Sequence, residues 1–168
     1  MREWHSIASD EWDQEALVTV VKNILTPQVT RSLPPAWQGN YTLERARDWI
    51  KERDDDGVTL IVVEILTRSP IGFIILFEST SGIDLRLGYL LAESAWDKGF
   101  ASELIKGLVE WCKNNNISTV TGGVENDNIA SIRVLEKNGF VRESHADDKE
   151  EQVFVLRIMH NNAVKTDS

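Results

Sequence analysis

The sequence contains a single cysteine, Cys112, and only three histidines, His5, His145 and His160. One cysteine excludes an internal disulfide framework and a cysteine-based zinc site. The histidines are scattered and show none of the spacings at which metal ligands recur, so we expect no bound metal.

Long apolar runs are also missing. No stretch reaches the roughly 18 uninterrupted apolar residues that indicate a membrane-spanning helix. The first residues, Met1–His5, lack the apolar run of a signal peptide. We therefore expect a cytoplasmic protein with no membrane partner.

Basic residues are outnumbered, with 18 Lys and Arg against 27 Asp and Glu, which gives a formal net charge of −9. A negative surface repels phosphate backbones, so we expect no nucleic-acid partner, whereas cationic partners such as amines are favoured. The 42% hydrophobic content is that of a globular chain that buries a core. The length predicts one domain over residues 1–168, with its core at about 4–160 and a frayed tail at about 161–168.

Apolar periodicity predicts a first helix over residues 16–25. Asp10 is placed to cap this helix and Pro27 to end it. The proline-bearing segment 26–39 is expected to be a loop within the domain.

A second helix is predicted after Thr42, its N-cap, and it ends near the charged run 52–57. Three strands follow at 58–65, 71–77 and 83–91, rich in β-branched and apolar residues. The short connections between them predict an antiparallel meander.

The second half of the chain alternates helices and strands. Residues 101–112 place apolar side chains at i, i+3, i+4, i+7 and i+11, which indicates an amphipathic helix that begins around Gly99. A strand at 117–124 and a short helix at 128–137 follow, and two last strands at 140–143 and 152–159 flank an acidic turn.

The predicted order is roughly β-α-α-β-β-β-α-β-α-β-β, in which a first strand precedes the helix at 16–25. Such apolar stripes are buried by one layer of mostly antiparallel sheet with helices on both faces. The sequence predicts a single domain of the α/β (α+β) class.

The first stretch that suggests chemistry is 88–101, G-Y-L-L-A-E-S-A-W-D-K-G-F-A, which joins a strand to the amphipathic helix. The first N–H groups of a helix lack partners and lie at the positive end of its dipole. Gly99 has no side chain, and Ala101 and Ser102 are small, so the helix start suits a phosphate or pyrophosphate. The stretch is neither a P-loop nor a dinucleotide fingerprint. A plain strand-to-helix turn is the alternative.

The second stretch is 124–140, V-E-N-D-N-I-A-S-I-R-V-L-E-K-N-G-F. Asn128 is placed as an N-cap, with Ser131 three residues further on, and Gly139 stops the short helix. Capping with ordinary packing is the alternative explanation for this stretch.

Together the two stretches resemble the GNAT acyltransferase superfamily, and most closely its branch of ribosomal-protein N-terminal acetyltransferases. The acetyl-CoA loop of that branch is matched by Tyr89, Leu90, Leu91, Ala92, Trp96, Lys98, Gly99, Phe100, Ala101, Ser102 and Glu103. The N-x-x-S-x-R-V-L-E-K-x-G-F segment is matched by Asn128, Ser131, Arg133, Val134, Leu135, Glu136, Lys137, Gly139 and Phe140. The resemblance covers 42–140 and implies a GNAT-type sheet in which one pair of strands splays apart.

The resemblance implies an N-acetyltransferase that uses acetyl-CoA as cosubstrate and transfers the acetyl group directly to a primary amine, without a covalent intermediate. It places the carbonyl-polarising backbone N–H at Leu90. The residues that it implies for cofactor binding are Leu90, Leu91, Trp96, Asp97, Lys98, Gly99, Phe100, Ala101, Ser102, Asn126, Asn128 and Ser131.

The resemblance also implies a hydroxyl that protonates the leaving thiolate, and Ser131 is its candidate, with Tyr89 as the alternative. Asp84 is a candidate base, although a solvated strand carboxylate is the plainer interpretation; His145 and a chain of water molecules are the other options. The acceptor stays open among a peptide N-terminus, a polyamine, an aminoglycoside and a small amino compound. Dimers are common in the superfamily, so a homodimer is among the expectations.

Two positions depart from the family pattern. Asp97 stands where the family has the first glycine of the phosphate loop, and Arg86 stands where it often has a glutamate. A carboxylate beside a pyrophosphate is unfavourable, and a missing glutamate removes one base. These departures support an alternative function, a catalytically weak acyl-CoA-binding domain that acts as a sensor or interaction module.

Overall fold

The computed structural model describes residues 2–3, 14–143 and 151–160. Four predictions fall wholly or largely outside these residues: the Asp10 cap, a catalytic role for His145, the acidic turn between the last two strands, and the frayed tail at 161–168. Among the described residues, no helix is long and apolar enough to span a membrane.

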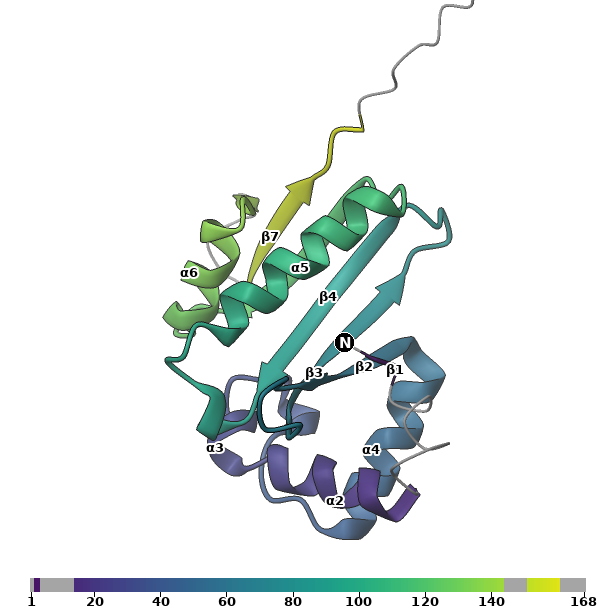
Figure 1. Ribbon diagram of the computed structural model, residues 1–168, viewed down its shortest axis with the longest axis vertical. Coiled ribbons are helices and arrows are strands. Elements are labelled where there is room, and N and C mark those ends of the chain that lie inside the picture. The colour runs from purple at the N-terminus through teal and green to yellow at the C-terminus, as the bar shows by residue number, and fades with distance from the viewer. Residues whose placement is uncertain (1, 4–13, 144–150, 161–168) are drawn as a thin grey trace, which may run out of the picture.

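One mixed sheet organises the described part of the chain (Figure 1). Its seven strands run in the order β1-β2-β3-β4-β5-β7-β6, and β4–β5 is the one parallel pair. The strands are β1 (Arg2–Glu3), β2 (Val58–Val63), β3 (Pro70–Glu78), β4 (Asp84–Leu91), β5 (Thr119–Glu125), β6 (Val141–Glu143) and β7 (Glu151–Arg157). The predicted meander and the mostly antiparallel mixed sheet are confirmed.

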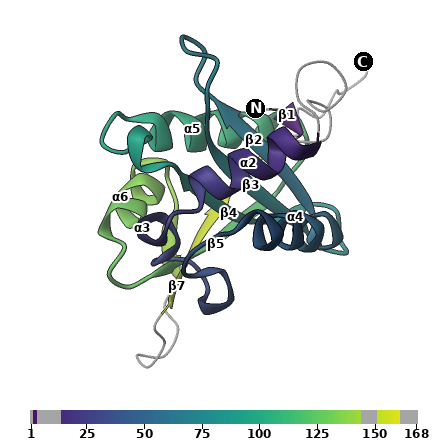
Figure 2. The same ribbon diagram turned by 90° about the horizontal axis from the view of Figure 1, so that it is seen from below.

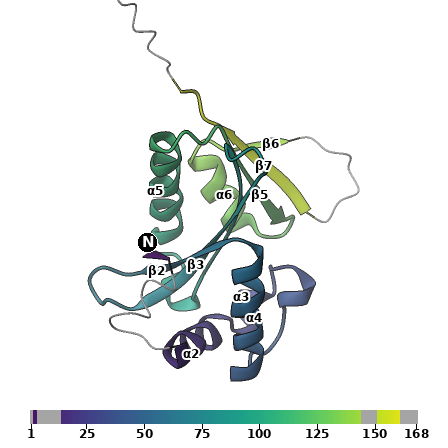
Figure 3. The same ribbon diagram turned by 90° about the vertical axis from the view of Figure 1, so that its right-hand side faces the viewer.

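Helices cover both faces of this sheet (Figure 3). They are α2 (Gln14–Ile24), α3 (Pro27–Thr30), α4 (Leu43–Asp56), α5 (Phe100–Asn114) and α6 (Ile129–Lys137), with single 3-10 turns η1 (Pro35–Trp37) and η2 (Glu93–Ala95). Successive side chains of a strand point to opposite faces, so Ile74 of β3 packs under α5, while Phe73 and Ile75 pack under α2 and α4. The alternation divides the apolar residues into two cores, one on each face.

The predicted helix starts are set by local hydrogen bonds. The Thr42 hydroxyl accepts from the Arg45 N–H at 3.2 Å and begins α4. The Asn128 side chain accepts from the Ser131 N–H at 3.1 Å and begins α6. Each cap satisfies one of the N–H groups that a helix start leaves unpaired.

The expected loop at 26–39 is structured instead, because it contains α3 and η1. Pro27 follows the end of α2 at Ile24, but it also begins α3, where a proline is tolerated because the first N–H has no helical partner. The hydroxyl of Thr26 caps α3 by accepting from the Val29 N–H. Helices of one turn leave no apolar periodicity, so the sequence pattern did not predict them.

The parallel pair β4–β5 separates part-way along its length. The two strands are paired only between 84–87 and 119–122. Beyond this point β4 continues to Leu91 beside β3 alone, while β5 continues to Glu125 beside β7. The predicted splay is therefore present, and within the described part of the chain residues 88–91 have no strand partner on their β5 side.

Candidate functional site

A cleft of about 560 Å³ lies at the splayed end of β4. Its lining comes from the end of β4, the turn into α5, the first turns of α6, and residues 28–33. Figure 2 shows α3 and α6, which border this cleft, on the same side of the molecule.

Most predicted site residues line this one cleft. They are Tyr89, Leu90, Leu91, Trp96, Asp97, Gly99, Phe100, Ala101, Ser102, Asn128 and Ser131. They belong to two segments about thirty residues apart in the sequence, which the splay of β4 and β5 brings together.

Three predicted residues do not line it. Lys98 and Asn126 are exposed outside the lining. Asp84 begins β4, where it accepts a hydrogen bond from the Ser81 hydroxyl at 3.0 Å. Tyr89 is five residues further along the strand, which corresponds to about 16 Å. The structure therefore keeps the candidate base apart from the two candidate acids.

Residues 28–33, called the wall segment from here on, were not predicted to belong to the site. Gln28, Val29, Arg31, Ser32 and Leu33 line the cleft. Its first residues belong to α3, whose N-cap is Thr26. The Thr26 hydroxyl donates a hydrogen bond to the carboxylate of Glu93, in the η2 turn that follows β4. No local pattern in the sequence near residue 30 indicated that this segment lies beside the end of β4, about 60 residues further along the chain.

The turn into α5 leaves the start of the helix open to a ligand. Gly99 is the N-cap at φ +82°, and no side chain of the described residues caps the helix. The first residues of α5, Phe100, Ala101 and Ser102, line the cleft. The free N–H groups at the positive end of a 15-residue helix therefore lie at the cleft.

Asp97 occupies the left-handed region at φ +57°. Few residues other than glycine adopt this conformation readily, although Asp and Asn tolerate it better than most. The backbone therefore explains why a glycine suits this position, independently of any ligand.

The pairing of β4 with β3 determines which backbone N–H groups face the gap. The Ala92 N–H donates to the Ile71 carbonyl at 2.8 Å. Hydrogen-bonded pairs of an antiparallel ladder recur at every second residue, so Leu90, paired with Phe73, also directs its N–H toward β3. The carbonyl of Leu90 also faces β3, because its oxygen lies 2.3 Å from the position that a Cβ atom on Gly72 of β3 would occupy.

The alternate residues, Tyr89 and Leu91, therefore direct their N–H groups toward the gap. The Leu91 carbonyl agrees with this direction, because it accepts a hydrogen bond from the Trp96 indole at 2.9 Å. The sequence placed the polarising N–H at Leu90; the ladder corrects this position to Leu91 or Tyr89.

Two hydroxyls meet beside the gap. The Tyr89 oxygen is buried and makes no direct hydrogen bond within the described part of the chain. Burial raises the pKa of the Tyr89 phenol, and the neighbouring Ser131 hydroxyl partly offsets the rise. The phenol is therefore neutral at physiological pH. A buried phenol that lies near the Ser131 hydroxyl without a well-formed hydrogen bond to it is suited to bind a ligand atom in the cleft.

Comparison with known families identifies the family of this chain. The family model described as "Acetyltransferase (GNAT) domain" matches residues 9–141. The chain belongs to the GNAT acetyltransferase family.

Solved GNAT structures superpose on most of this GNAT chain. An acetyltransferase (GNAT family) from Bacillus anthracis gives a TM-score of 0.74 at 18% identity, covering 86% of this chain and 90% of that one. Spermidine N-acetyltransferase from Vibrio cholerae, in complex with CoA and spermine, gives 0.66 at 16% identity, covering 88% and 91%. Ribosomal-protein-alanine N-acetyltransferase from Brucella melitensis gives 0.64 at 18%, covering 86% and 96%. A search of curated proteins gives no match.

The family prediction made from the two motifs is thus confirmed, and the fold of this GNAT domain accounts for their separation in the sequence. One motif ends β4 and begins α5, the other caps α6, and both border the gap between β4 and β5. Within the described residues, no group of three or more His, Cys, Asp or Glu side chains is placed to hold a metal ion.

Proposed function

We propose that this GNAT protein is an acetyl-CoA-dependent N-acetyltransferase that moves an acetyl group directly to a primary amine, either a peptide N-terminus or a small amine. One observation carries the proposal. A single cleft joins an uncapped helix start to an unpaired strand edge and two adjacent hydroxyls. These groups correspond to the anionic, amide-bearing and sulfur-bearing parts of acetyl-CoA.

In this proposal the start of α5 holds the pyrophosphate, because its free N–H groups and small first residues suit an anion. The guanidinium of Arg133, on α6 at the other side of the cleft, adds a positive charge. The pantetheine arm contains amides, which are matched by the unpaired backbone groups of Tyr89 and Leu91.

The reaction follows from these placements. The amine nitrogen attacks the thioester carbonyl carbon, a C–N bond forms and the C–S bond breaks. The Leu91 or Tyr89 N–H stabilises the oxygen on which negative charge develops. The hydroxyl of Ser131 or Tyr89 supplies a proton to the leaving thiolate.

The amine must lose a proton before or during the attack. Asp84 lies about 16 Å from Tyr89 along the strand, so we assign this proton to water in the cleft. The net charge of −9 favours a cationic acceptor, and the motif likeness to the ribosomal-protein branch favours a protein N-terminus.

The test is a thiol-release assay with acetyl-CoA and a panel of amines: an alanine-starting peptide, spermidine, kanamycin and a simple alkylamine. We expect one class to release CoA well above the rate without an amine. Calorimetric binding of acetyl-CoA with no release for any amine would instead support the sensor alternative. No binding at all would refute both functions.

The protein's own cysteine should not interfere with this assay. Cys112 is fully buried in α5, and burial raises the pKa of its thiol to about 11. The reactive thiolate is therefore scarce at pH 8. Ellman's reagent at pH 8 should leave the native protein unlabelled over the assay time, whereas the protein in guanidinium chloride should release one equivalent. Rapid labelling of the native protein would show that α5 opens readily.

Asp97 should weaken cofactor binding, because this negatively charged residue lines the cleft just before the helix start at which we propose the pyrophosphate. Asp97→Gly removes the charge and relaxes a left-handed backbone position. We expect acetyl-CoA to bind roughly threefold more tightly at low salt, with a smaller gain at high salt.

Asp97→Asn separates the two causes in the same calorimetric titration, because asparagine also tolerates positive φ but carries no charge. If charge is the cause, both variants bind more tightly; if backbone relaxation is the cause, only the glycine variant does. Unchanged or weaker binding in both would show that the Asp97 carboxylate does not oppose the cofactor.

A further inference from the structure

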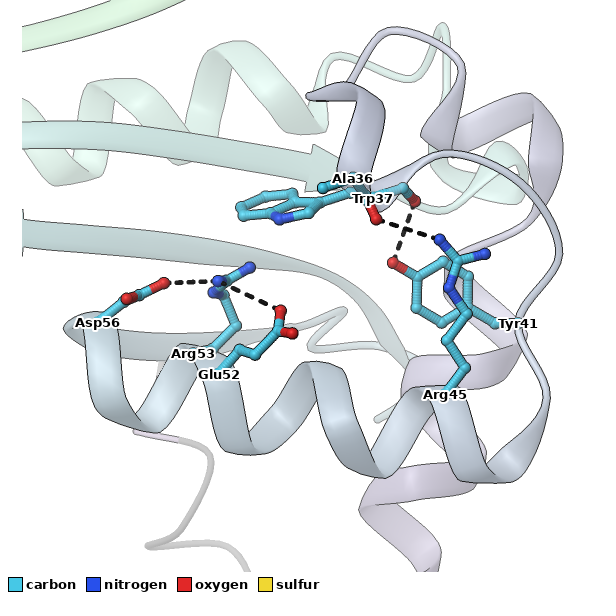
Figure 4. A network of polar contacts seen from close by, with 7 residues as sticks. All are labelled: Ala36, Trp37, Tyr41, Arg45, Glu52, Arg53 and Asp56. Carbon is cyan, nitrogen blue, oxygen red and sulfur yellow. Dashed lines mark hydrogen bonds and ion pairs between the residues drawn. The ribbon is translucent and has the colours of Figure 1, made fainter.

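A row of three side chains on α4 holds the loop that follows the wall segment. Arg45, Trp49 and Arg53 are spaced by four residues and therefore share one face of the helix. Figure 4 shows Arg45 and Arg53 pointing from α4 toward this loop. All three contact residues 36–41, called the anchored loop from here on.

Arg45 holds the backbone of the anchored loop. Its guanidinium donates to the carbonyls of Asn40 at 2.8 Å, Gln38 at 2.8 Å and Ala36 at 3.2 Å. It also lies over the Tyr41 ring, at 4.3 Å from the centroid. Several hydrogen bonds from one planar, charged group fix the path of the loop more tightly than a single contact would.

Arg53 holds the side chain of Trp37 in the same loop. Its guanidinium carbon lies 4.2 Å from the centroid of the Trp37 ring, and Trp49 meets that ring edge-on at 5.7 Å. The Tyr41 hydroxyl donates to the Trp37 carbonyl at 3.0 Å. Trp37 is thus fixed at both its ring and its backbone.

Arg53 is an unusual residue for this purpose. It is only 4% exposed, and its Nε and Nη1 have no hydrogen-bond partner among the described residues. Its Nη2 forms ion pairs with Asp56 and Glu52 at the edge of the buried site. Burying a guanidinium in this way costs free energy that an apolar side chain of similar length would not cost. Stability alone therefore does not explain an arginine at this position.

The anchored loop is connected to the wall segment by direct hydrogen bonds. The Gln38 side chain donates to the Leu33 carbonyl at 2.8 Å. The Gly39 N–H donates to the hydroxyl of Thr30 at 3.1 Å, and that hydroxyl donates to the Thr26 carbonyl at 3.0 Å. A displacement of the loop would therefore displace residues on the cleft side of the same segment.

We propose that Arg53 is a positioning residue for the acceptor side of the cleft: by fixing Trp37 it fixes the anchored loop, and through the loop it sets the place of the wall segment. The inference rests on the proposed function, in which α5 and the edge of β4 bind the cofactor and the wall segment is left to contact the amine. Arg45 fixes the same loop by hydrogen bonds from its guanidinium to the backbone carbonyls of the loop.

The test compares Arg53→Met with Arg47→Met. Methionine fills the space between the two indoles without a charge, so the variant should fold, with a melting temperature no lower than that of the unaltered protein. Arg47 lies on the same helix but pairs with Glu15 of α2, away from the anchored loop, which makes it a matched control. Both are assayed with acetyl-CoA and the most active amine of the panel.

We expect Arg53→Met to raise the KM for that amine about tenfold, with kcat and the KM for acetyl-CoA changed less than about twofold. Arg53→Lys should recover part of the effect, because lysine keeps the cation but not the planar stacking. Arg47→Met should change neither KM. A purely structural role would lower the melting temperature of Arg53→Met and leave the ratio of the two KM values unchanged, and that result would overturn the proposal.

Amide hydrogen exchange supplies a measurement that needs no substrate. Arg53→Met should speed exchange across 28–33, on the order of tenfold, and leave the first turns of α5 as protected as before. If no amine is acetylated, the proposed function fails and this measurement still decides the role of Arg53. Unchanged exchange across the wall segment would overturn the positioning proposal even if the enzyme is active.

Discussion

Gly99→Val is expected to weaken acetyl-CoA binding by at least about tenfold, since the pyrophosphate needs close access to the first N–H groups of α5. A side chain at Gly99 would meet no protein atom within 4 Å, so it would stand in open space beside the cleft. Calorimetric titration of acetyl-CoA into both proteins measures the loss. Binding as tight as in the unaltered protein would show that the pyrophosphate lies elsewhere.

The same substitution also strains the backbone, because Gly99 has a φ of +82°. Gly82 is a matched control: its φ is +70°, its side-chain position is equally open, and it lies in the turn between β3 and β4, outside the cleft. A β-branched residue at either site costs about 1–2 kcal/mol of stability. Both variants should therefore melt at a lower temperature, but only Gly99→Val should lose acetyl-CoA binding.

Ser131→Ala is expected to lower turnover by roughly ten- to a hundredfold, at the low end of general acid catalysis because a CoA thiolate is already a fair leaving group. Acetyl-CoA affinity should change little. The N–H of Ser131, which the Asn128 cap binds, is retained in alanine, so the helix start and the melting temperature should be preserved. The turnover rate at saturating substrate and the melting temperature, both measured on the same preparation of the variant and compared with the unaltered protein, test these two statements.

Tyr89→Phe tests the second hydroxyl. If one proton passes through both groups, each single variant loses most of the effect, and the Ser131→Ala/Tyr89→Phe double variant is only slightly slower than either. If Ser131→Ala has a normal rate and Tyr89→Phe does not, Tyr89 is the donor. If all three variants have normal rates, solvent protonates the thiolate and neither side chain takes part.

The pKa of Tyr89 predicts how turnover depends on pH if this phenol donates the proton. Burial raises the pKa of Tyr89 above its ordinary value of 10, and the Ser131 hydroxyl only partly opposes this. The phenol therefore keeps its proton to a higher pH than a solvent-exposed tyrosine does. Turnover that depends on Tyr89 should show no alkaline fall until the pH exceeds the ordinary tyrosine pKa of 10. A fall near pH 8 would assign the step to another group.

The sequence by itself determined the elements whose signals are local. The amphipathic stripe of α5, the caps at Thr42 and Asn128 and the β-branched strands of the meander were all predicted, because each depends on residues within one or two turns or one hairpin. The two motifs identified the family for the same reason, since each is a continuous strand-loop-helix or helix-cap segment.

Only the tertiary structure decided how these elements form a site. Whether Leu90 or Leu91 offers its N–H depends on which residues of β3 pair with β4, and a pairing register is not encoded in the strand alone. Asp84 was a plausible base until its position at the far end of β4 separated it from the cleft.

The wall segment and Arg53 show the same limit most clearly. The wall segment, residues 28–33, reaches the cleft because the anchored loop holds it there. Arg53 is buried because the indole rings of Trp37 and Trp49 cover it. In the sequence this arginine stands in a charged run, where a solvent-exposed side chain is the expectation. Contacts between residues distant in the chain exist only once the packed core has closed the intervening loops, so no local pattern records them.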